Sequence, residues 1–251
     1  MSKKVDKRLK LSYTSKMPCP SWSLEAVTTC PGSRKLNGTL VSVCQGCYAT
    51  TGFYMMPVVK AARVHNREDW KRTDWVFTMV QMLEGELYFR WFDSGDVYCK
   101  GLADKIYSVM KQTPDTQHWL PTRSHKIHKI KPVLTKMKRL RNVAVRYSSD
   151  NLDSYAREIH GSVVLTDDGI DSYTPRLEGD ELYICGAYSR EGKCGDCRTC
   201  WDKTINCIGY PIHGSKMSKV AGVSKVTNKQ SSNLSSFTHP TTLNTETLMS
   251  L

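Results

Sequence analysis

The sequence predicts an α/β protein whose sheet is parallel and whose strands are joined by helical crossovers. Short apolar runs typical of strands alternate along the chain with segments in which apolar residues recur at helical spacing. This alternation favours a parallel sheet, because each crossover helix returns the chain to the same edge of the sheet. About six strands fit either a doubly wound sheet or an incomplete barrel, and both collect their chemistry at the carboxyl ends of the strands.

The individual elements follow from apolar periodicity and from residues that start or stop helices. Residues 57–84 are expected to be helical in one or two pieces, because Pro57 suits a first turn and Gly85 suits a helix end. Further helices are expected at residues 102–110, 127–140 and 152–159. The expected strands are residues 9–13, 87–92, 118–120, 143–147, 162–166 and 181–185.

The composition is that of a globular protein, with 39% hydrophobic and 24% charged residues in a chain of 251. The first residues are charged and lead into no apolar run, so we expect no signal peptide. No stretch reaches the roughly 18–20 apolar residues that a membrane span needs. We therefore expect a cytoplasmic protein without a membrane partner.

One α/β metal-binding domain is expected over residues 1–202, followed by a basic, flexible tail over residues 203–251. The domain contains a cysteine loop at residues 19–51, which is rich in Gly, Ser and Thr and shows no period. A second cysteine-rich loop lies at residues 185–202. The end of the chain is rich in Ser, Thr, Asn and Lys with few large apolar residues, which is typical of a segment without a core.

Seven of the ten cysteines fall in two clusters with the spacing of metal ligands. In a cytoplasmic protein such clusters bind metal more often than they form disulfides. The first cluster is Cys30, Cys44 and Cys47, and the second is Cys185, Cys194, Cys197 and Cys200.

Thiolates bind both zinc and iron–sulfur clusters, and the spacing favours the second. Structural zinc prefers two separated C-x2-C pairs, whereas successive three-residue spacings resemble loops that wrap an iron–sulfur cluster. We expect one or two clusters of the 4Fe-4S type and keep zinc as the alternative. Three thiolates would leave one iron of the first cluster open to a ligand, unless Cys19 closes it. Cys19, like Cys99 and Cys207, is otherwise a free buried thiol.

The formal charge of +12 indicates a polyanionic partner, of which nucleic acid is the usual one. The charge is concentrated in residues 126–141, which contain seven Lys or Arg and no acidic residue. The alternative interpretation of this stretch is a solvated, lysine-rich helix face.

The sequence resembles the phage "gene product 88" family over residues 9–202, through motifs that occur in order. They are Trp22-Ser23-Leu24, Thr29-Cys30-Pro31-Gly32, Cys44-x2-Cys47-Tyr48-Ala49, Arg90-Trp91, Gly95-Asp96, Thr122-Arg123 and Cys194-Gly195-Asp196-Cys197-x2-Cys200-Trp201. That family is distantly similar to radical S-adenosylmethionine (SAM) enzymes. The resemblance implies an incomplete barrel of about six strands, with a three-cysteine cluster after the first strand and a carboxyl-terminal auxiliary cluster.

The same resemblance implies roles for single residues. Cys30, Cys44 and Cys47 would hold an open 4Fe-4S cluster, Gly95 and Asp96 would contact SAM, and Arg123 and Arg146 would line the cofactor and substrate site. One functional hypothesis is a radical SAM-like enzyme that acts in the host cytoplasm. The alternative hypothesis is a non-catalytic iron–sulfur or zinc protein that binds nucleic acid through residues 126–141.

Overall fold

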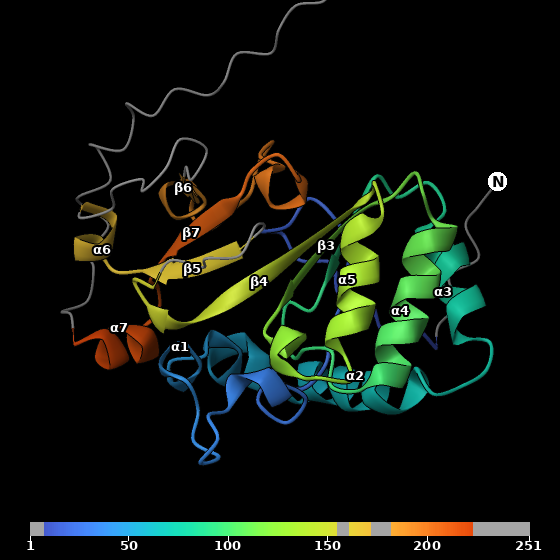
Figure 1. Ribbon diagram of the computed structural model, residues 1–251, viewed down its shortest axis with the longest axis horizontal. Helices are drawn as coiled ribbons and strands as arrows, with labels where there is room; N and C mark the ends of the chain where they lie inside the picture. Colours follow the sequence, from blue (N-terminus) through green and yellow to red (C-terminus); the bar gives the residue numbers. More distant parts are fainter. Residues whose placement is uncertain (1–7, 155–160, 172–181, 223–251) are drawn as a thin grey trace, which may run out of the picture.

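The computed structural model describes residues 8–154, 161–171 and 182–222, which contain one seven-stranded sheet (Figure 1). The strands are β1 (Ser21–Trp22), β2 (Tyr88–Trp91), β3 (Gln117–Thr122), β4 (Val143–Leu152), β5 (Gly161–Leu165), β6 (Leu182–Ile184) and β7 (Cys207–Pro211). The helices are α1 (Ser42–Gln45), α2 (Pro57–Asp69), α3 (Trp75–Leu83), α4 (Lys100–Gln112), α5 (Lys131–Arg139), α6 (Asp167–Asp171) and α7 (Ser215–Ala221). Every pair of neighbouring strands is parallel, which confirms the predicted α/β class and parallel sheet.

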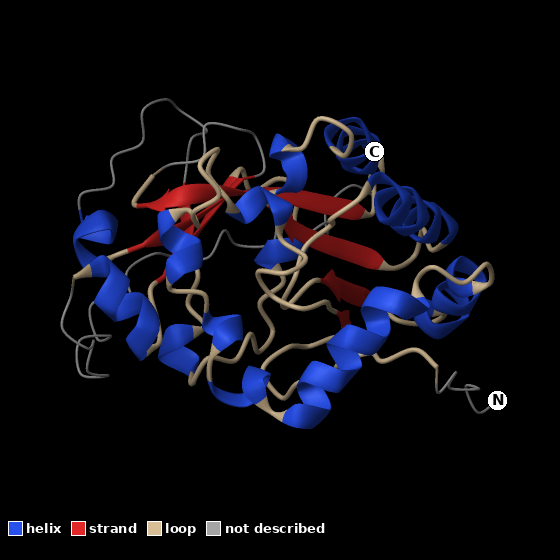
Figure 2. Ribbon diagram, turned by 90° about the horizontal axis from the view of Figure 1, so that it is seen from below, coloured by secondary structure: helices blue, strands red, loops and turns tan. Residues whose placement is uncertain are grey.

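The strand order is β1-β2-β3-β4-β5-β7-β6, so the first five strands follow one another across the sheet in chain order. Right-handed crossovers that always move in one direction place their helices on one face of a sheet. Helices α3, α4 and α5 accordingly pack side by side, and Figure 2 shows the strands in a curved row with helices along its outer side. Strands β1 to β5 therefore form a singly wound sheet and not a doubly wound one.

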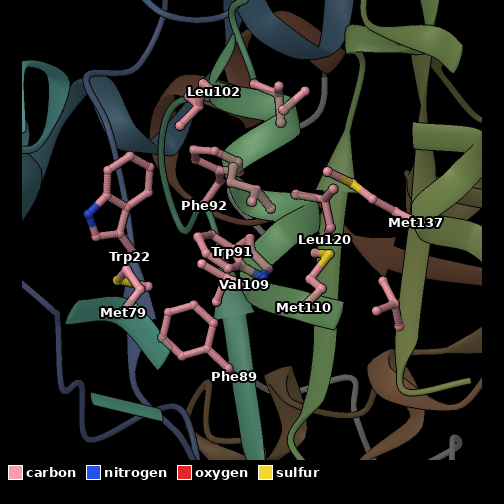
Figure 3. Close-up of a cluster of buried hydrophobic side chains, with 14 of the residues drawn as sticks. Trp22, Met79, Phe89, Trp91, Phe92, Leu102, Val109, Met110, Leu120 and Met137 are labelled. Atoms are coloured by element: carbon pink, nitrogen blue, oxygen red, sulfur yellow. The ribbon is translucent and has the colours of Figure 1, made fainter. Parts of the chain in front are cut away.

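The main core lies between this sheet and the helices α3, α4 and α5 (Figure 3). Alternate strand residues supply its sheet side, because successive side chains of a strand point to opposite faces. The sheet side is Phe89 and Trp91 of β2, Leu120 of β3, and Val143, Val145 and Tyr147 of β4. The facing helix residues include Leu102, Ile106, Val109, Met110, Val133, Leu134 and Met137, and the sequence predicts these at helical spacing.

The opposite face of the sheet, here called the inner face, carries Tyr88 and Arg90 of β2, Trp119 of β3 and Arg146 of β4. It is covered by the carboxyl-terminal cysteine loop. The indole of Trp201 packs edge-on against Tyr88 and Trp119 and donates a hydrogen bond to the Phe89 carbonyl at 3.0 Å. The two faces therefore differ in kind, since the outer face packs on helices and the inner face packs on a loop.

The prediction of a first strand at residues 9–13 is wrong. Only Ser12 pairs with the sheet, through an isolated antiparallel bridge to Ser21. The apolar residues of this segment do not share one buried face. Leu9 is buried in the core, whereas Tyr13 is 68% exposed. The first strand is instead the two-residue β1, which is too short to show a period.

Residues 207–221 also differ from the predicted flexible tail. They form β7, which lies between β5 and β6, and α7, which lies beside α1. The four residues from Cys207 to Tyr210 are bounded by polar segments and include a glycine, so they give a weak strand signal. Residues 223–251 of the expected tail lie outside the described residues.

The expected helix at residues 152–159 falls largely outside the described residues as well. Leu152 itself ends β4, and residues 155–160 are not described. No helix in the described ranges is long and apolar enough to cross a membrane.

Candidate functional site

The thiols of Cys30, Cys44 and Cys47, here called the N-terminal thiol group, lie together at the carboxyl ends of the central strands. Burial raises the pKa of Cys30, and the Asp96 carboxylate and the thiols of Cys44 and Cys47 raise it further. The three thiols are therefore neighbours. Cys44 lies in α1, which packs on the end of β4 where the Ser42 hydroxyl bonds to the Asp150 carbonyl at 3.1 Å.

Two glycines allow the loop that carries Cys30 to press against the ends of β2 and β3. A Cβ on Gly95 would lie 2.6 Å from Leu24 Cβ and 2.7 Å from Thr29 Oγ1. A Cβ on Gly32 would lie 2.2 Å from the Arg123 carbonyl oxygen. Real Cβ contacts do not come so close. The structure thus gives Gly95 a packing role, and its predicted contact with a cofactor stays a prediction.

Asp96 fastens the end of β2 to the end of β3. Its Oδ1 accepts hydrogen bonds from the Thr122 hydroxyl at 2.6 Å and the Val97 amide at 2.7 Å, and its Oδ2 accepts one from the Arg123 amide at 2.9 Å. The side chain is buried, and burial raises its pKa despite these bonds. The Ser124 hydroxyl also lies within reach of this carboxylate. The Asp96 oxygens are thus largely engaged within the protein, and their predicted contact with a ligand stays a prediction.

The Arg123 side chain points to the end of β4 and lies near the N-terminal thiol group. Its Nε and Nη2 donate to the Ser149 carbonyl at 3.0 and 2.9 Å. Burial raises the pKa of Cys44, and Arg123 opposes this shift as the nearest cation. Arg123 is thus placed to stabilise negative charge on these thiols.

Helix α7 closes over the turn between Cys44 and Cys47. A Cβ on Gly46 would lie 2.7 Å from Met217 Sδ and 2.8 Å from Met217 Cα, so this turn needs glycine. Lys216 also donates to the Thr50 hydroxyl at 2.7 Å. A segment predicted as tail therefore helps to hold the N-terminal thiol group.

Cys185, Cys194, Cys197 and Cys200, here called the C-terminal thiol group, lie beneath the inner face. Burial raises the pKa of Cys185, and the thiols of Cys194 and Cys197 add to the shift. Burial raises the pKa of Cys200 to about 12, and Cys185 contributes. These mutual effects indicate that the four thiols share one neighbourhood, and the Cys197 amide donates to the Cys194 carbonyl at 3.1 Å within the same turn.

Hydroxyl groups surround two members of the C-terminal thiol group. The Cys200 Sγ lies 3.3 Å from the Tyr210 hydroxyl, and the Cys197 Sγ lies 3.3 Å from Thr199 Oγ1 and 3.6 Å from the Tyr183 hydroxyl. Burial alone raises the pKa of Cys197, but hydrogen bonds from Thr199 and Tyr183 outweigh burial and lower it. The environment therefore favours a thiolate at Cys197.

Arg146 holds the C-terminal thiol group against the sheet. It is fully buried and donates to the carbonyls of Thr199, Cys200, Asp202 and Ile205 at 2.5–3.0 Å. Because four backbone carbonyls occupy its guanidinium, Arg146 acts as a structural residue and not as the lining of a substrate site.

Cys19 belongs with the C-terminal thiol group and not with the N-terminal one. It is buried beside Trp119 and Trp201. Burial raises its pKa to about 12, Arg90 opposes the shift and the Cys194 thiol adds to it. The alternative in which Cys19 completes the N-terminal cluster therefore loses its geometric support. Cys207 is buried among the residues of β5, and Cys99 precedes α4.

Within the described residues, no group of three or more His, Cys, Asp or Glu side chains is arranged to hold a single metal ion. Both thiol groups nevertheless suit an anionic, thiolate-bound centre in their donors and surroundings. Each gathers thiols from separate segments, shields them in part from water, and includes arginines that lower the pKa of its members, Arg123 in one and Arg90 and Arg190 in the other.

A model of the "Gene product 88" family matches residues 1–203, which is most of the chain. The chain belongs to this family. Searches of curated proteins and of solved structures found no match. The match ends before β7 and α7, so the family pattern covers both thiol groups but not the two elements that complete the sheet and cover Gly46.

Arg90 is the residue of the inner face to which the sequence assigns no role. Its guanidinium lies over the Trp119 ring, 4.5 Å from the centroid. It also influences thiols of the C-terminal group, since it lowers the pKa of Cys194. The available signal was the placement of a cation at the third position of an otherwise aromatic strand, Tyr88-Phe89-Arg90-Trp91.

Proposed function

We propose that this protein is an iron–sulfur protein in which the N-terminal thiol group holds a 4Fe-4S cluster with one open iron and the C-terminal thiol group holds a second cluster. The observation that carries the proposal is the separation of seven thiols, of which Cys44 is buried and the other six are half-buried, into a group of three and a group of four. A cubane cluster has four irons, so three thiolates leave one coordination site for an exogenous ligand.

The proposed activity is radical SAM-like. Cys30, Cys44 and Cys47 would hold the cluster, which in its reduced state would supply the electron that cleaves a bound SAM. The N-terminal thiol group lies after the first strand and at the carboxyl ends of the central strands, where parallel sheets place their ligands. The singly wound strand order and the curved row of strands in Figure 2 support the incomplete barrel that this activity implies.

An iron–sulfur cluster is favoured over a single zinc ion by the arrangement of the thiols. Four thiolates on one zinc ion converge at about 2.3 Å from the metal, and no such convergent group exists among the described residues. A cluster is wider than an ion and keeps its ligands farther apart. The successive three-residue spacings of Cys194, Cys197 and Cys200, which are typical of loops that wrap a cluster, support the wider centre.

The test is the iron and acid-labile sulfide content of protein purified without oxygen, followed by incubation with SAM and dithionite. We expect about eight irons per chain, four in each of two cubanes, and formation of 5'-deoxyadenosine. The Cys44→Ser variant is expected to lose iron from one cluster and all cleavage of SAM. Bound zinc without sulfide would refute the proposal. Full iron content without 5'-deoxyadenosine would refute the SAM activity alone.

A second candidate function, nucleic-acid binding, is favoured by the exposed face of α5 and its flanking turns. Lys129, Lys131, Lys136, Arg139 and Arg141 are exposed, and none has an ion-pair partner among the described residues. Lys126, in contrast, pairs with Asp150 at 2.7 Å. An unpaired row of cations releases counterions when it binds phosphates.

Reversal of three of these charges, in Lys129→Glu, Lys136→Glu and Arg139→Glu combined, should weaken binding to duplex DNA or RNA and reduce its salt dependence. The free energy of unfolding should change little, because exposed substitutions cost about 0.5 kcal/mol or less each. Fluorescence anisotropy at several salt concentrations measures the binding. If the unaltered protein has no affinity at low salt, the basic face serves solubility only.

A further inference from the structure

The guanidinium of Arg90 is partly buried and has few protein partners. Its Nε is inaccessible to solvent and has no hydrogen-bond partner. Its Nη1 and Nη2 make only long contacts, at 3.7 Å to Met17 Sδ and at 3.5 Å to the Tyr48 hydroxyl. The Nε–H has therefore lost contact with water without gaining an acceptor, which is costly.

A second orphaned donor lies next to the first. The indole nitrogen of Trp119, a residue that is 5% exposed, also lacks a hydrogen-bond partner. The Trp119 ring is the one on which the Arg90 guanidinium stacks, at 4.5 Å. Two adjacent buried N–H donors without acceptors indicate a site that is complete only when it receives an acceptor.

No carboxylate of the described residues neutralises Arg90. The nearby Asp93 is committed to Arg63, whose Nη2 lies 3.3 Å from Asp93 Oδ1, and both of these side chains are buried. The two guanidiniums and the one carboxylate leave an excess positive charge on the inner face. An anion would supply both the missing acceptor and the missing negative charge, whereas a neutral group would supply the acceptor only.

The surrounding hydroxyls cannot provide the missing charge. Tyr48 donates to the Asp93 carbonyl at 2.6 Å, and Tyr54 packs against Tyr48. A tyrosine hydroxyl is uncharged at pH 7, because its ordinary pKa is about 10. These hydroxyls can add neutral hydrogen bonds around an anion.

We propose that Arg90 and Trp119 form a binding site on the inner face for the anionic group, carboxylate or phosphate, of a small ligand. Arg90 lies between the two thiol groups. On one side is Tyr48, the residue after Cys47, and on the other are Met17 and Cys194, whose sulfurs are 3.8 Å apart. A ligand held at Arg90 is thereby positioned between them. The site goes beyond the proposed function, because anion binding at Arg90 requires no metal.

Arg90 has a rival role as a fixed counter-ion for the C-terminal thiols, since it lowers the pKa of Cys19 and of Cys194. The two roles make different demands. If Arg90 is only a counter-ion, its charge is neutralised by the thiol group and it does not bind an added anion. If Arg90 forms a binding site, it binds free anions from solution.

The test is NMR of ¹⁵N-labelled, metal-free protein titrated with inorganic phosphate and, separately, with acetate. The Nε–H signal of Arg90 and the indole N–H signal of Trp119, assigned from Arg90→Gln and Trp119→Phe, should shift together with one dissociation constant. The tighter of the two probes identifies the ligand's anionic group. Arg90→Gln should weaken binding at least tenfold. Arg90→Lys should recover part of it, because lysine keeps the charge but not the planar fork.

Arg198→Gln is the matched control. The Arg198 guanidinium also lies over an inner-face aromatic ring, 5.0 Å from the centroid of Tyr88, but its Nη1 is satisfied by the Gly195 and Cys197 carbonyls at 2.7 and 3.0 Å. Its removal should leave the dissociation constants unchanged. The proposal is overturned if neither probe shifts the two signals, or if Arg198→Gln weakens binding as much as Arg90→Gln. It is also overturned if Arg90→Gln lowers the iron content of loaded protein while anion binding persists.

Discussion

Arg146 is a buried cation whose partners are backbone carbonyls of one loop. Four carbonyls from Thr199 to Ile205 accept its hydrogen bonds. Without the guanidinium these carbonyls lose their donor, and the loop that carries Cys197 and Cys200 loses its attachment to β4. A single side chain thus decides whether the C-terminal thiol group forms.

We expect Arg146→Met to lower the free energy of unfolding by about 3 kcal/mol or more, because hydrogen bonds to charged groups contribute about 1.5–3 kcal/mol each. Urea unfolding measures the loss, and proteolysis should cut first within residues 199–205. Arg139→Met, at an exposed position of α5, is the control and should cost about 0.5 kcal/mol or less. Equal losses in the two variants would contradict the role given to Arg146.

His118 is a buried imidazole that must stay neutral. Trp91 Nε1 donates to its Nδ1 at 3.2 Å. Thr113 Oγ1, which donates to the Val109 carbonyl, lies 2.8 Å from Nε2 and therefore accepts the Nε2 proton. Burial lowers the pKa of His118 to about 3, from the usual 6.5.

Because the folded-state pKa is depressed, His118 stabilises the fold fully above pH 6.5, and this stability is lost as the pH falls toward 3. We expect a loss of about 3 kcal/mol between pH 7.5 and pH 4.5 from this residue. Urea unfolding at both pH values gives the loss of unfolding free energy for the unaltered protein and for His118→Gln. The difference between these two losses is the contribution of His118. The control is His128→Gln, at an exposed position, which should lose as much stability between the two pH values as the unaltered protein. If His118→Gln also loses as much, His118 is not the source of the pH dependence.

At the scale of elements, strand β7 links β6 to the rest of the sheet. It pairs with β5 on one side and with β6 on the other, and β6 has no other partner in the sheet. The family pattern ends at residue 203, just before this strand. Strand β6, which lies inside the family region, therefore depends for its pairing on a strand outside that region.

A chain that ends at residue 203 should lose β6 and expose the edge of β5, whereas a chain that ends at residue 222 should keep every described contact. We expect the shorter chain to be insoluble or sensitive to protease within residues 182–203, because unpaired strand edges aggregate. Limited proteolysis and circular dichroism distinguish the two chains. A shorter chain as resistant as the longer one would show that β7 is dispensable.

The sequence predicts long periodic elements well and short ones poorly. Helices α4 and α5 and strands β3 and β4 follow clear apolar patterns and lie close to the predicted ranges. Strand β1 has two residues and exists because Ser21 and Trp22 pair with Arg90 and Trp91, which are distant in sequence. Strand β7 is likewise defined by its neighbours, so tertiary pairing and not local pattern determines both.

The same limit applies to the candidate site. Cysteine spacing predicts which thiols are near one another, because three-residue spacings place them on one turn. Spacing does not predict that Cys19 lies near the Cys194 thiol. Nor does it predict that Arg90 and Trp119 each have a donor without a partner, since their contact depends on the register between strands β2 and β3. Metal binding itself stays a prediction, as do the cofactor roles of Gly95, Asp96 and Arg123.

At the scale of the whole molecule, the two thiol groups tie together segments that are far apart in the chain. The N-terminal group joins the loop after β1 to the ends of β2, β3 and β4. The C-terminal group joins residues 16–19 to residues 185–200, for instance through the hydrogen bond from the Cys194 amide to the Lys16 carbonyl at 3.0 Å. A centre bound at either group would therefore stabilise the entire fold.

We expect Cys194→Ser to lower both the iron content and the free energy of unfolding, since metal-binding free energy is partly folding free energy. The same holds for serine at Cys185, Cys197 or Cys200. Cys99→Ser is the control, because Cys99 lies at the start of α4 outside both groups, and it should retain all iron. Metal analysis together with urea unfolding makes the comparison, and full iron in Cys194→Ser would contradict the assignment.

The position of β7 in the sheet also sets an order of maturation. During synthesis, the residues that surround the N-terminal thiol group in the sheet are complete once β4 has emerged, at residue 152. Strand β6 emerges before β7 but has nothing to pair with until β7 follows it. The loop between β6 and β7 carries Cys194, Cys197 and Cys200, so this loop stays unanchored on the ribosome for longer. The C-terminal thiol group is thus completed later than the N-terminal one, and α7 closes over Gly46 last.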